Sequence, residues 1–111
     1  MTTVEVEGGI CGFISVIDVS RLSDLCIVRL TSGCSMVMAC TQDLEKVTWK
    51  DALNPRSEDW LYRVMFRHIR HCGCLVPAAV AKAIEVEIGA ALPGNAHLKF
   101  RTPATCCDSG P

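Results

Sequence analysis

Residues 13–31 read FISVIDVSRLSDLCIVRLT, and this stretch decides the fold class. Residues 13–19 are rich in β-branched side chains and predict a strand, and residues 25–31 predict a second, more apolar strand. The polar segment 20–24 is expected to form the turn between them. Upstream, residues 3–7 alternate Val and Glu, which is typical of a strand with one solvated face. We therefore expect an antiparallel meander of three strands.

Apolar residues recur at helical spacing beyond residue 32 and predict two or three helices. The first is expected to begin near Cys34, the second to be capped by Ser57 and ended by the run 72–74, and the third to be opened by Pro77 and closed by Gly89. The expected core faces hold Val37, Cys40, Leu44 and Val47 in the first, Leu61, Val64, Met65 and His68 in the second, and Val80, Ile84 and Ile88 in the third.

The end of the chain completes the predicted architecture. Residues 97–101 are expected to form a closing strand, and residues 102–111 contain Pro, Gly and Ser and are expected to be a flexible tail. Because 111 residues is the usual size of one domain, residues 4–101 are expected to form a single domain. The predicted fold class is α+β, with an antiparallel three- to four-stranded sheet packed against two or three helices.

Composition argues against several classes of function. The net charge is −1 at pH 7 and aromatic residues make up 5% of the chain. Neither a basic surface nor a base-stacking platform for nucleic acid is therefore expected. Residues 1–7 lack the features of a signal peptide, and no apolar run reaches the roughly 18 residues that span a bilayer. We expect a cytoplasmic protein that binds neither membranes nor nucleic acid.

The chain has eight cysteines. In a compartment that keeps thiols reduced, metal binding or thiol reactivity explains them better than disulfides do. Cys26 and Cys40 fall on apolar faces and are predicted to be core residues. The vicinal pair Cys106-Cys107 lies in the predicted tail, where no role is assigned to it.

Three of the cysteines lie where a functional thiol is favoured. Cys11 is flanked by glycines, which permit tight turns. Cys34 and Cys74 lie near predicted helix N-termini, where free amides and the helix dipole favour the thiolate form. His71 and Cys72 place further soft ligands within one turn of chain. Because zinc and iron–sulfur clusters take such ligands, we predict a zinc or iron–sulfur site formed by Cys11, Cys34 and Cys74, with His71 or Cys72 as the fourth ligand.

The chain also resembles a small family of uncharacterised prokaryotic proteins, found largely in anaerobes and described as a domain of unknown function. The resemblance covers most of residues 4–101. Its motifs are Cys11-Gly12-Phe13, Ser32-Gly33-Cys34, His71-Cys72-Gly73-Cys74-Leu75-Val76-Pro77, Lys82-Ala83-Ile84-Glu85-Val86-Glu87 and Ala91-Leu92-Pro93. The family pattern picks out Cys11, Cys34, His71 and Cys74. It usually has proline directly after the cysteines that match Cys34 and Cys74, where this chain has Ser35 and Leu75. The resemblance implies the site and names no reaction.

Three functions remain open from the sequence. The first is a metal-binding module, which requires the sulfurs of Cys11, Cys34 and Cys74 to lie on the same side of the molecule. The second is a thiol redox or peroxide-reducing enzyme with Cys34 or Cys74 as its nucleophile. The third is an interaction domain, such as a homodimer, whose cysteines only pack. The arginine stripe 63/67/70 is interpreted as a solvated helix face.

Overall fold

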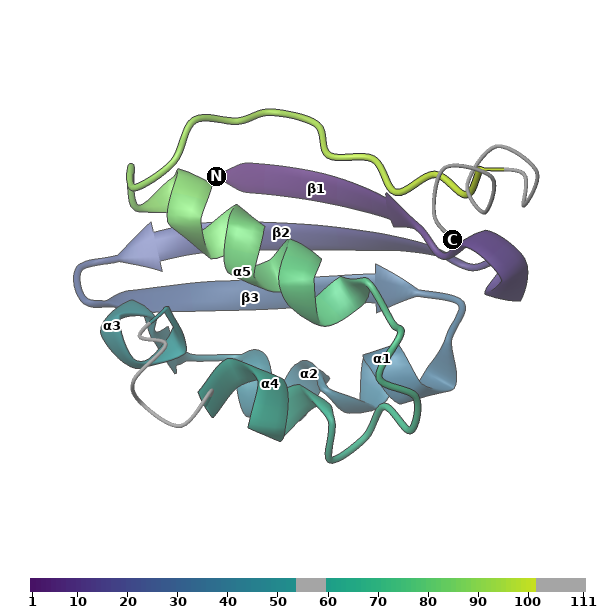
Figure 1. Cartoon of the computed structure of the whole chain (residues 1–111). Coiled ribbons are helices and arrows are strands. Elements are labelled where there is room, and N and C mark those ends of the chain that lie inside the picture. Colours follow the sequence, from purple (N-terminus) through teal and green to yellow (C-terminus); the bar gives the residue numbers. More distant parts are fainter. Residues whose placement is uncertain (54–59, 102–111) are drawn as a thin grey trace, which may run out of the picture.

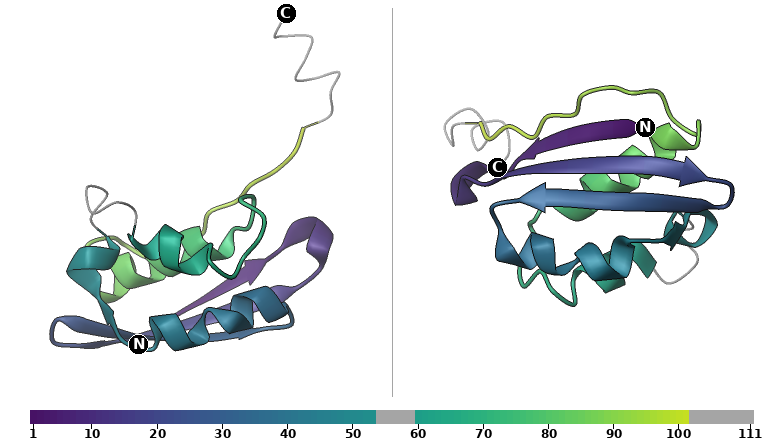
Figure 2. Two further views of the ribbon diagram at one scale, coloured as in Figure 1. Left: turned by 90° about the horizontal axis from the view of Figure 1, so that it is seen from below. Right: turned by 180° about the vertical axis from the view of Figure 1, so that it is seen from behind.

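The structure is a computed structural model that describes residues 1–53 and 60–101. A four-stranded antiparallel sheet has the order β1-β2-β3-β4 and is covered on one face by the long helix α5 (Figures 1 and 2). The chain runs through these elements: β1 (Thr2–Glu7), a 3-10 turn η1 (Gly9–Cys11), β2 (Ile14–Leu22), β3 (Leu25–Ser32), α1 (Ser35–Ala39), α2 (Thr41–Leu44), β4 (Val47–Thr48), α3 (Trp49–Ala52), α4 (Trp60–Met65) and α5 (Val76–Glu87). The predicted α+β fold class is confirmed.

The predicted meander is confirmed, with a shorter second turn than expected. In the first hairpin Glu7 lies opposite Ile14, and in the second Leu22 lies opposite Leu25. The predicted turn 20–24 is wrong in its first three residues, because these continue β2 and pair with β3. Only Ser23 and Asp24 remain in the turn, and Ser23 adopts the positive φ of 58° that such tight turns require.

The predicted first helix is wrong as a continuous element, although its core face is right. Val37, Cys40, Leu44 and Val47 are all buried. The helix breaks at Cys40, whose N–H bonds the carbonyl of Val37 at 3.0 Å in the tighter i→i−3 pattern. Val47 belongs instead to β4, which pairs with Leu25 and Cys26 at the edge of the sheet. Val47 fitted the apolar spacing of the predicted helix because it is buried, although it lies in a strand.

The fourth strand is β4 and not the predicted closing strand 97–101. Residues 92–101 carry no helix or strand and are exposed throughout. No backbone hydrogen bond joins them to the sheet in the described part of the chain. Strand β1 is consequently an edge strand. The predicted tail 102–111 lies outside the described residues.

Helix α4 ends earlier than predicted, at Met65 and not at the run 72–74. Its predicted cap, Ser57, lies outside the described residues. Three of the four predicted core positions, Leu61, Val64 and Met65, are buried. The fourth, His68, is half-exposed instead, because the chain has left the helix there and the ring is drawn to Asp43, with Nε2 2.6 Å from Oδ2.

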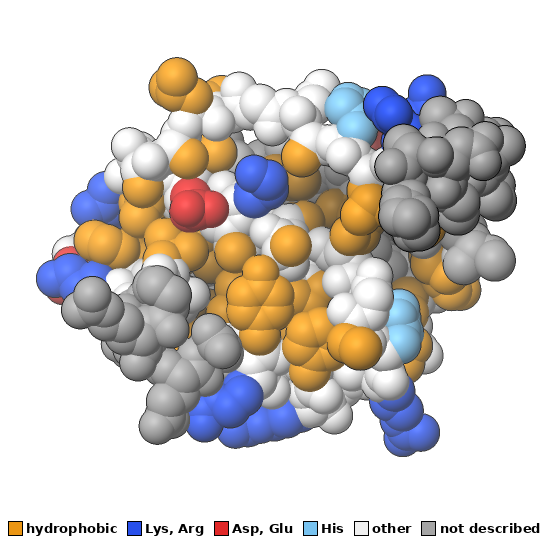
Figure 3. All heavy atoms as spheres, viewed as in Figure 1, with side chains coloured by type: hydrophobic (Ala, Val, Ile, Leu, Met, Phe, Trp, Pro, Cys, Tyr) orange, Lys and Arg blue, Asp and Glu red, His pale blue; other side chains and the backbone are white. Residues whose placement is uncertain are grey.

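Helix α5 matches its prediction closely. Pro77 lies in its first turn, and Val80 and Ile84 are fully buried against the sheet. Gly89 follows the helix with φ 82°, and its N–H bonds the carbonyl of Val86 while that of Ala90 bonds the carbonyl of Glu85 at 2.8 Å. This pair of bonds is a Schellman cap, which satisfies carbonyls that a helix end leaves free. Figure 3 shows hydrophobic side chains gathered on the face that carries α4 and α5. No helix in the described residues is long and apolar enough to cross a membrane.

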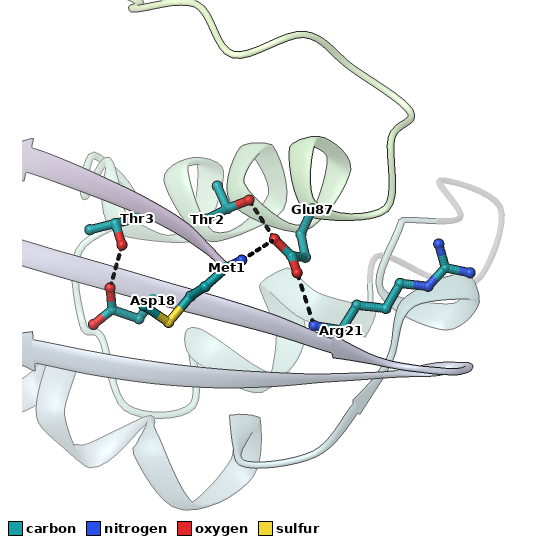
Figure 4. A network of polar contacts seen from close by, with 6 residues as sticks. All are labelled: Met1, Thr2, Thr3, Asp18, Arg21 and Glu87. Atoms are coloured by element: carbon teal, nitrogen blue, oxygen red, sulfur yellow. Dashed lines mark hydrogen bonds and ion pairs between the residues drawn. The ribbon is translucent and has the colours of Figure 1, made fainter.

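Glu87 ties the end of α5 to the sheet (Figure 4). Its carboxylate accepts a hydrogen bond from Thr2 Oγ1 at 2.6 Å and another from the backbone N–H of Arg21 at 3.1 Å. The amino group of Met1 lies 3.6 Å away. The bond from Thr2, the bond from Arg21 and the charge of the amino terminus together lower the pKa of Glu87.

We expect Glu87→Gln to lower the free energy of unfolding by about 1 kcal/mol at neutral pH, since it removes the charge that these donors face. Because the pKa of Glu87 is lowered by folding, its contribution is present above the ordinary carboxyl pKa of 4.5 and is lost as the pH falls through the lower folded value. Urea unfolding curves of the two proteins should therefore converge on acidification. Glu85→Gln on the same helix serves as the control, and an equal loss there would contradict the assignment.

Candidate functional site

Three predicted ligands lie at one end of the sheet. Cys11 lies in the turn between β1 and β2, Cys34 follows β3, and Cys74 precedes α5. The end of β1, the start of β2 and the end of β3 coincide, because residue 7 pairs with 14 and residue 15 with 32. The start of α5 lies at this same end, since Glu87 at its other end is fixed to the start of β1 (Figure 1). The three cysteines are therefore on the same side of the molecule.

The turn that carries Cys11 depends on glycine. Gly9 and Gly12 both have positive φ, at 70° and 74°. The Cys11 thiol donates a hydrogen bond to the carbonyl of Gly8 at 3.4 Å. A Cβ atom at Gly8 would lie 2.3 Å from the sulfur, so only glycine leaves room for this orientation. The exposed Cys11 thiol is thus held in a defined position by its own turn.

Cys34 occupies the junction between β3 and α1. Its backbone is extended, with φ −86° and ψ 120°, and its carbonyl accepts the first bond of the helix from Met38 at 3.1 Å. Its N–H donates to Ser32 Oγ at 3.0 Å. Ser32 is itself bonded to Ser15 at 2.8 Å, so the start of β2 fixes the junction. The side chain of Cys34 is half-buried and packs against the hydrophobic core.

Cys74 is half-buried just before α5, and its ionisation differs from the prediction. The backbone N–H of Val76 at the helix start does stabilise the thiolate, as expected. Burial nevertheless raises the pKa of the Cys74 thiol, and negative charge on Cys34 or Cys11 raises it further. The prediction that the helix terminus makes this thiol easier to ionise is therefore wrong, because burial outweighs the hydrogen bond.

The thiols of Cys34 and Cys74 also affect the pKa of a fourth cysteine, Cys40. Cys40 is fully buried beneath the site, and its thiol lies 3.5 Å from the carbonyl oxygen of Met36 and 3.6 Å from that of Met65. Burial is the main cause that raises the pKa of Cys40 to about 11, and negative charge on Asp43, Cys74 or Cys34 contributes the rest. Sequence patterning identified Cys40 as a core residue, and that is confirmed. Nothing in its spacing indicated the proximity to Cys34 and Cys74.

His71 and Cys72 are both exposed on the loop that leads to Cys74. The loop is held by a long bond of 3.5 Å from the N–H of Cys74 to the carbonyl of His71. Within residues 1–53 and 60–101, no three His, Cys, Asp or Glu side chains form a ready-made metal site. The structure thus brings Cys11, Cys34 and Cys74 to one end of the molecule without closing them around an ion.

A shallow hollow of about 470 Å³ adjoins this end of the molecule. It is lined by Ser35, Met36, Ala39, Arg67, His68 and Arg70. Arg67 and Arg70 are exposed as expected, but they lie beyond the end of α4 at Met65, so the predicted arginine stripe on a helix face is wrong. The pair formed by His68 and Asp43 beside it was not predicted, because the two residues come from different elements and no local spacing connects them.

Comparison with known proteins identifies the family. Residues 2–100 match a family of unknown function, DUF6951. The chain belongs to this family. No curated protein and no solved structure matches it. The DUF6951 match includes all five predicted ligands and ends before Cys106-Cys107, so the candidate site belongs to the family region and the vicinal pair does not.

Proposed function

We propose that this DUF6951 protein binds a soft metal ion, as Zn²⁺ or as an iron–sulfur cluster, through Cys11, Cys34 and Cys74. One observation carries the proposal: the fold brings Cys11, Cys34 and Cys74 from three separate parts of the sequence to the same end of the sheet. Such convergence is not needed for packing, since Cys11 is exposed and contributes nothing to the core.

The electrostatics of the cluster favour a cation over free thiolates. Thiolates at these positions repel one another, and burial adds to the cost of ionising Cys74. A divalent cation offsets both the repulsion between the thiolates and the cost of ionising Cys74, because it neutralises the thiolates and displaces their protons. Half-burial of Cys34 and Cys74 strengthens the attraction by excluding water from one side of the site.

The fourth ligand is expected from the loop before α5. His71 and Cys72 lie three and two residues before Cys74, and both side chains are exposed and able to turn. Gly73 lies between them and Cys74, and a Cβ atom there would meet no neighbouring atom, so the loop has room to adjust. Metal binding would then close the three loops over the end of the sheet, as coupled binding and ordering does in many small metal sites.

The proposal is tested by elemental analysis of protein made and kept without oxygen. We expect one zinc ion or one iron–sulfur cluster per chain, and less than a tenth of that content in Cys34→Ser and in Cys74→Ser. Cys26→Ala is the matched control, because this thiol is buried near the opposite end of β3 and should leave the metal content unchanged. Metal-free wild type, or full metal content in both serine variants, would overturn the proposal.

Comparison of His71→Ala with Cys72→Ser identifies the fourth ligand. The variant that lacks a true ligand should release metal to a competing chelator roughly ten- to a hundredfold more readily, while the other should match wild type. Equal retention in both variants would show that neither side chain binds the ion. Circular dichroism of the metal-free variants checks that each remains folded.

A thiol redox enzyme is the second candidate, favoured by the electrostatic coupling of Cys34 with Cys74. In that reaction the two thiols would form a disulfide, and their two electrons and two protons would reduce a peroxide to an alcohol and water. The raised pKa of Cys74 disfavours this thiol as the nucleophile, because the thiolate is the reactive form, and we therefore assign the nucleophile to Cys34. Fast alkylation of Cys34 alone, in protein that retains no metal, would favour this reaction over metal binding.

A further inference from the structure

The segment after α5 carries apolar side chains that nothing in the described structure covers. Leu98 is 66% exposed and Phe100 is 91% exposed. They alternate with His97, Lys99 and Arg101, which is the pattern of a strand with one apolar and one basic face. The left view of Figure 2 shows that the end of this segment turns away from the sheet. A strand-like segment is therefore presented without a partner.

Strand β1 offers the complementary surface. It is paired only with β2 in the described structure, so its outer edge presents free backbone groups. Val4 and Val6 are half-buried and pack against the core on the α5 side of the sheet, while Glu5 and Glu7 are exposed on the other face. The edge is therefore apolar on one face and acidic on the other, opposite in charge to the segment.

We propose that residues 97–101 of one chain add to the outer edge of β1 in a second copy of the chain, with the exchange repeated around a two-fold axis. An antiparallel register that sets residue 97 opposite residue 7 brings apolar side chains together on one face of the sheet and opposite charges together on the other. It places Leu98 beside Val6 and Phe100 beside Val4 on the α5 side. On the open face it places Lys99 beside Glu5, and cross-strand pairs of these kinds stabilise a sheet.

The topology favours a second copy over the chain's own edge. Helix α5 ends beside the start of β1, where Glu87 bonds Thr2. The described segment that leaves this point runs in the same direction as the chain's own β1, as the trace in Figure 1 shows, and forms no backbone hydrogen bond with it. Antiparallel pairing is slightly more stable than parallel pairing, and the segment of a second chain can approach the β1 edge in that direction. The connection 89–96 spans up to roughly 28 Å when extended, which is enough to cross between chains.

Sedimentation of the full chain in the presence of a reductant tests the proposal, because the reductant removes disulfides between chains. We expect wild type to sediment as a dimer and the double variant Leu98→Asp, Phe100→Asp to sediment as a monomer. Leu92→Asp is the matched control, since Leu92 is also 91% exposed but lies outside the proposed strand, and it should remain dimeric. All three side chains are exposed, so folding should be unaffected.

A charge-reversal cycle tests the register. Glu5→Lys and Lys99→Glu should each raise the dimer dissociation constant by roughly tenfold, because each dimer contains the pair twice, and the double variant should recover most of the loss. A monomeric wild type, a dimeric Leu98→Asp, Phe100→Asp variant or no recovery in the cycle would overturn the proposal. A monomer with residues 98–100 protected from hydrogen exchange would place the strand on its own β1 and would also overturn it. These measurements read mass and exchange, so their outcome is independent of metal binding.

Discussion

Ile84→Ala is expected to lower the free energy of unfolding by about 3 kcal/mol, a large part of the stability of a domain this size. Ile84 is completely buried in α5, where the helix packs across β1 and β2. Truncation removes three carbon atoms from a close-packed site and leaves a cavity that the surrounding strands cannot fill. Urea unfolding followed by circular dichroism, with a reductant present, measures the change.

Lys82→Ala is the control for this prediction. Lys82 lies on the same helix but is exposed, and alanine is a strong helix former, so the change should be within about 0.5 kcal/mol of wild type. Because both variants introduce alanine, similar losses in the two would show that the burial of residue 84 does not decide the effect. The contact between α5 and the strands would then not be the main source of stability.

The elements that the sequence predicted best are those whose signals are local. The hairpins at residues 3–31 follow from alternation and turn residues, and α5 follows from Pro77, Gly89 and its apolar spacing. The break at Cys40 and the strand at Val47 were missed. Both depend on where the chain can reach the edge of β3, which is a property of the tertiary structure.

Residues 97–101 show that a local strand pattern is not sufficient to predict a strand. Its alternating pattern is genuine, but a strand exists only where a neighbouring edge accepts it. Within the described residues no such pairing is present. A pattern can therefore predict that a segment suits a strand without predicting which chain supplies the partner.

The candidate site was predictable in position but not in electrostatics. Glycine neighbours and helix starts indicated Cys11, Cys34 and Cys74, and these features lie at the ends of elements that the topology brings together. The start of α5 does lower the pKa of Cys74 through the N–H of Val76, as the sequence predicted. Burial and the neighbouring thiols outweigh it, and both arise from residues distant in sequence.

Cys40 gives the second large expected effect, a loss of stability in alkali. The folded protein holds the Cys40 proton because burial raises its pKa from the ordinary value of 9.0 to about 11. An unfolded chain releases that proton near pH 9. The thiol also lies beside the carbonyl oxygens of Met36 and Met65, to which a thiolate could donate nothing.

Between pH 9 and 11 the free energy of unfolding should therefore fall by about 2–3 kcal/mol through this thiol alone, since each unit of pKa difference is worth about 1.4 kcal/mol. The contribution is fully present below pH 9 and is lost as the pH rises toward 11. Urea unfolding at a series of pH values, on metal-free protein with a reductant, measures the slope. Cys26 and Cys74, whose pKa values are also raised by burial, add to it in the same direction.

Cys40→Ala separates this thiol from every other group that titrates in alkali. The variant should be less stable at neutral pH by about 1 kcal/mol, because a buried sulfur is lost, but its stability should decline less steeply above pH 9. The two curves should therefore approach or cross near pH 10–11. Parallel curves would show that Cys40 ionises as easily in the folded state as in the unfolded one, and this would contradict its placement in a dry core beneath Cys34 and Cys74. Converging curves would show that the folded protein holds the Cys40 proton and resists forming a thiolate at this buried position.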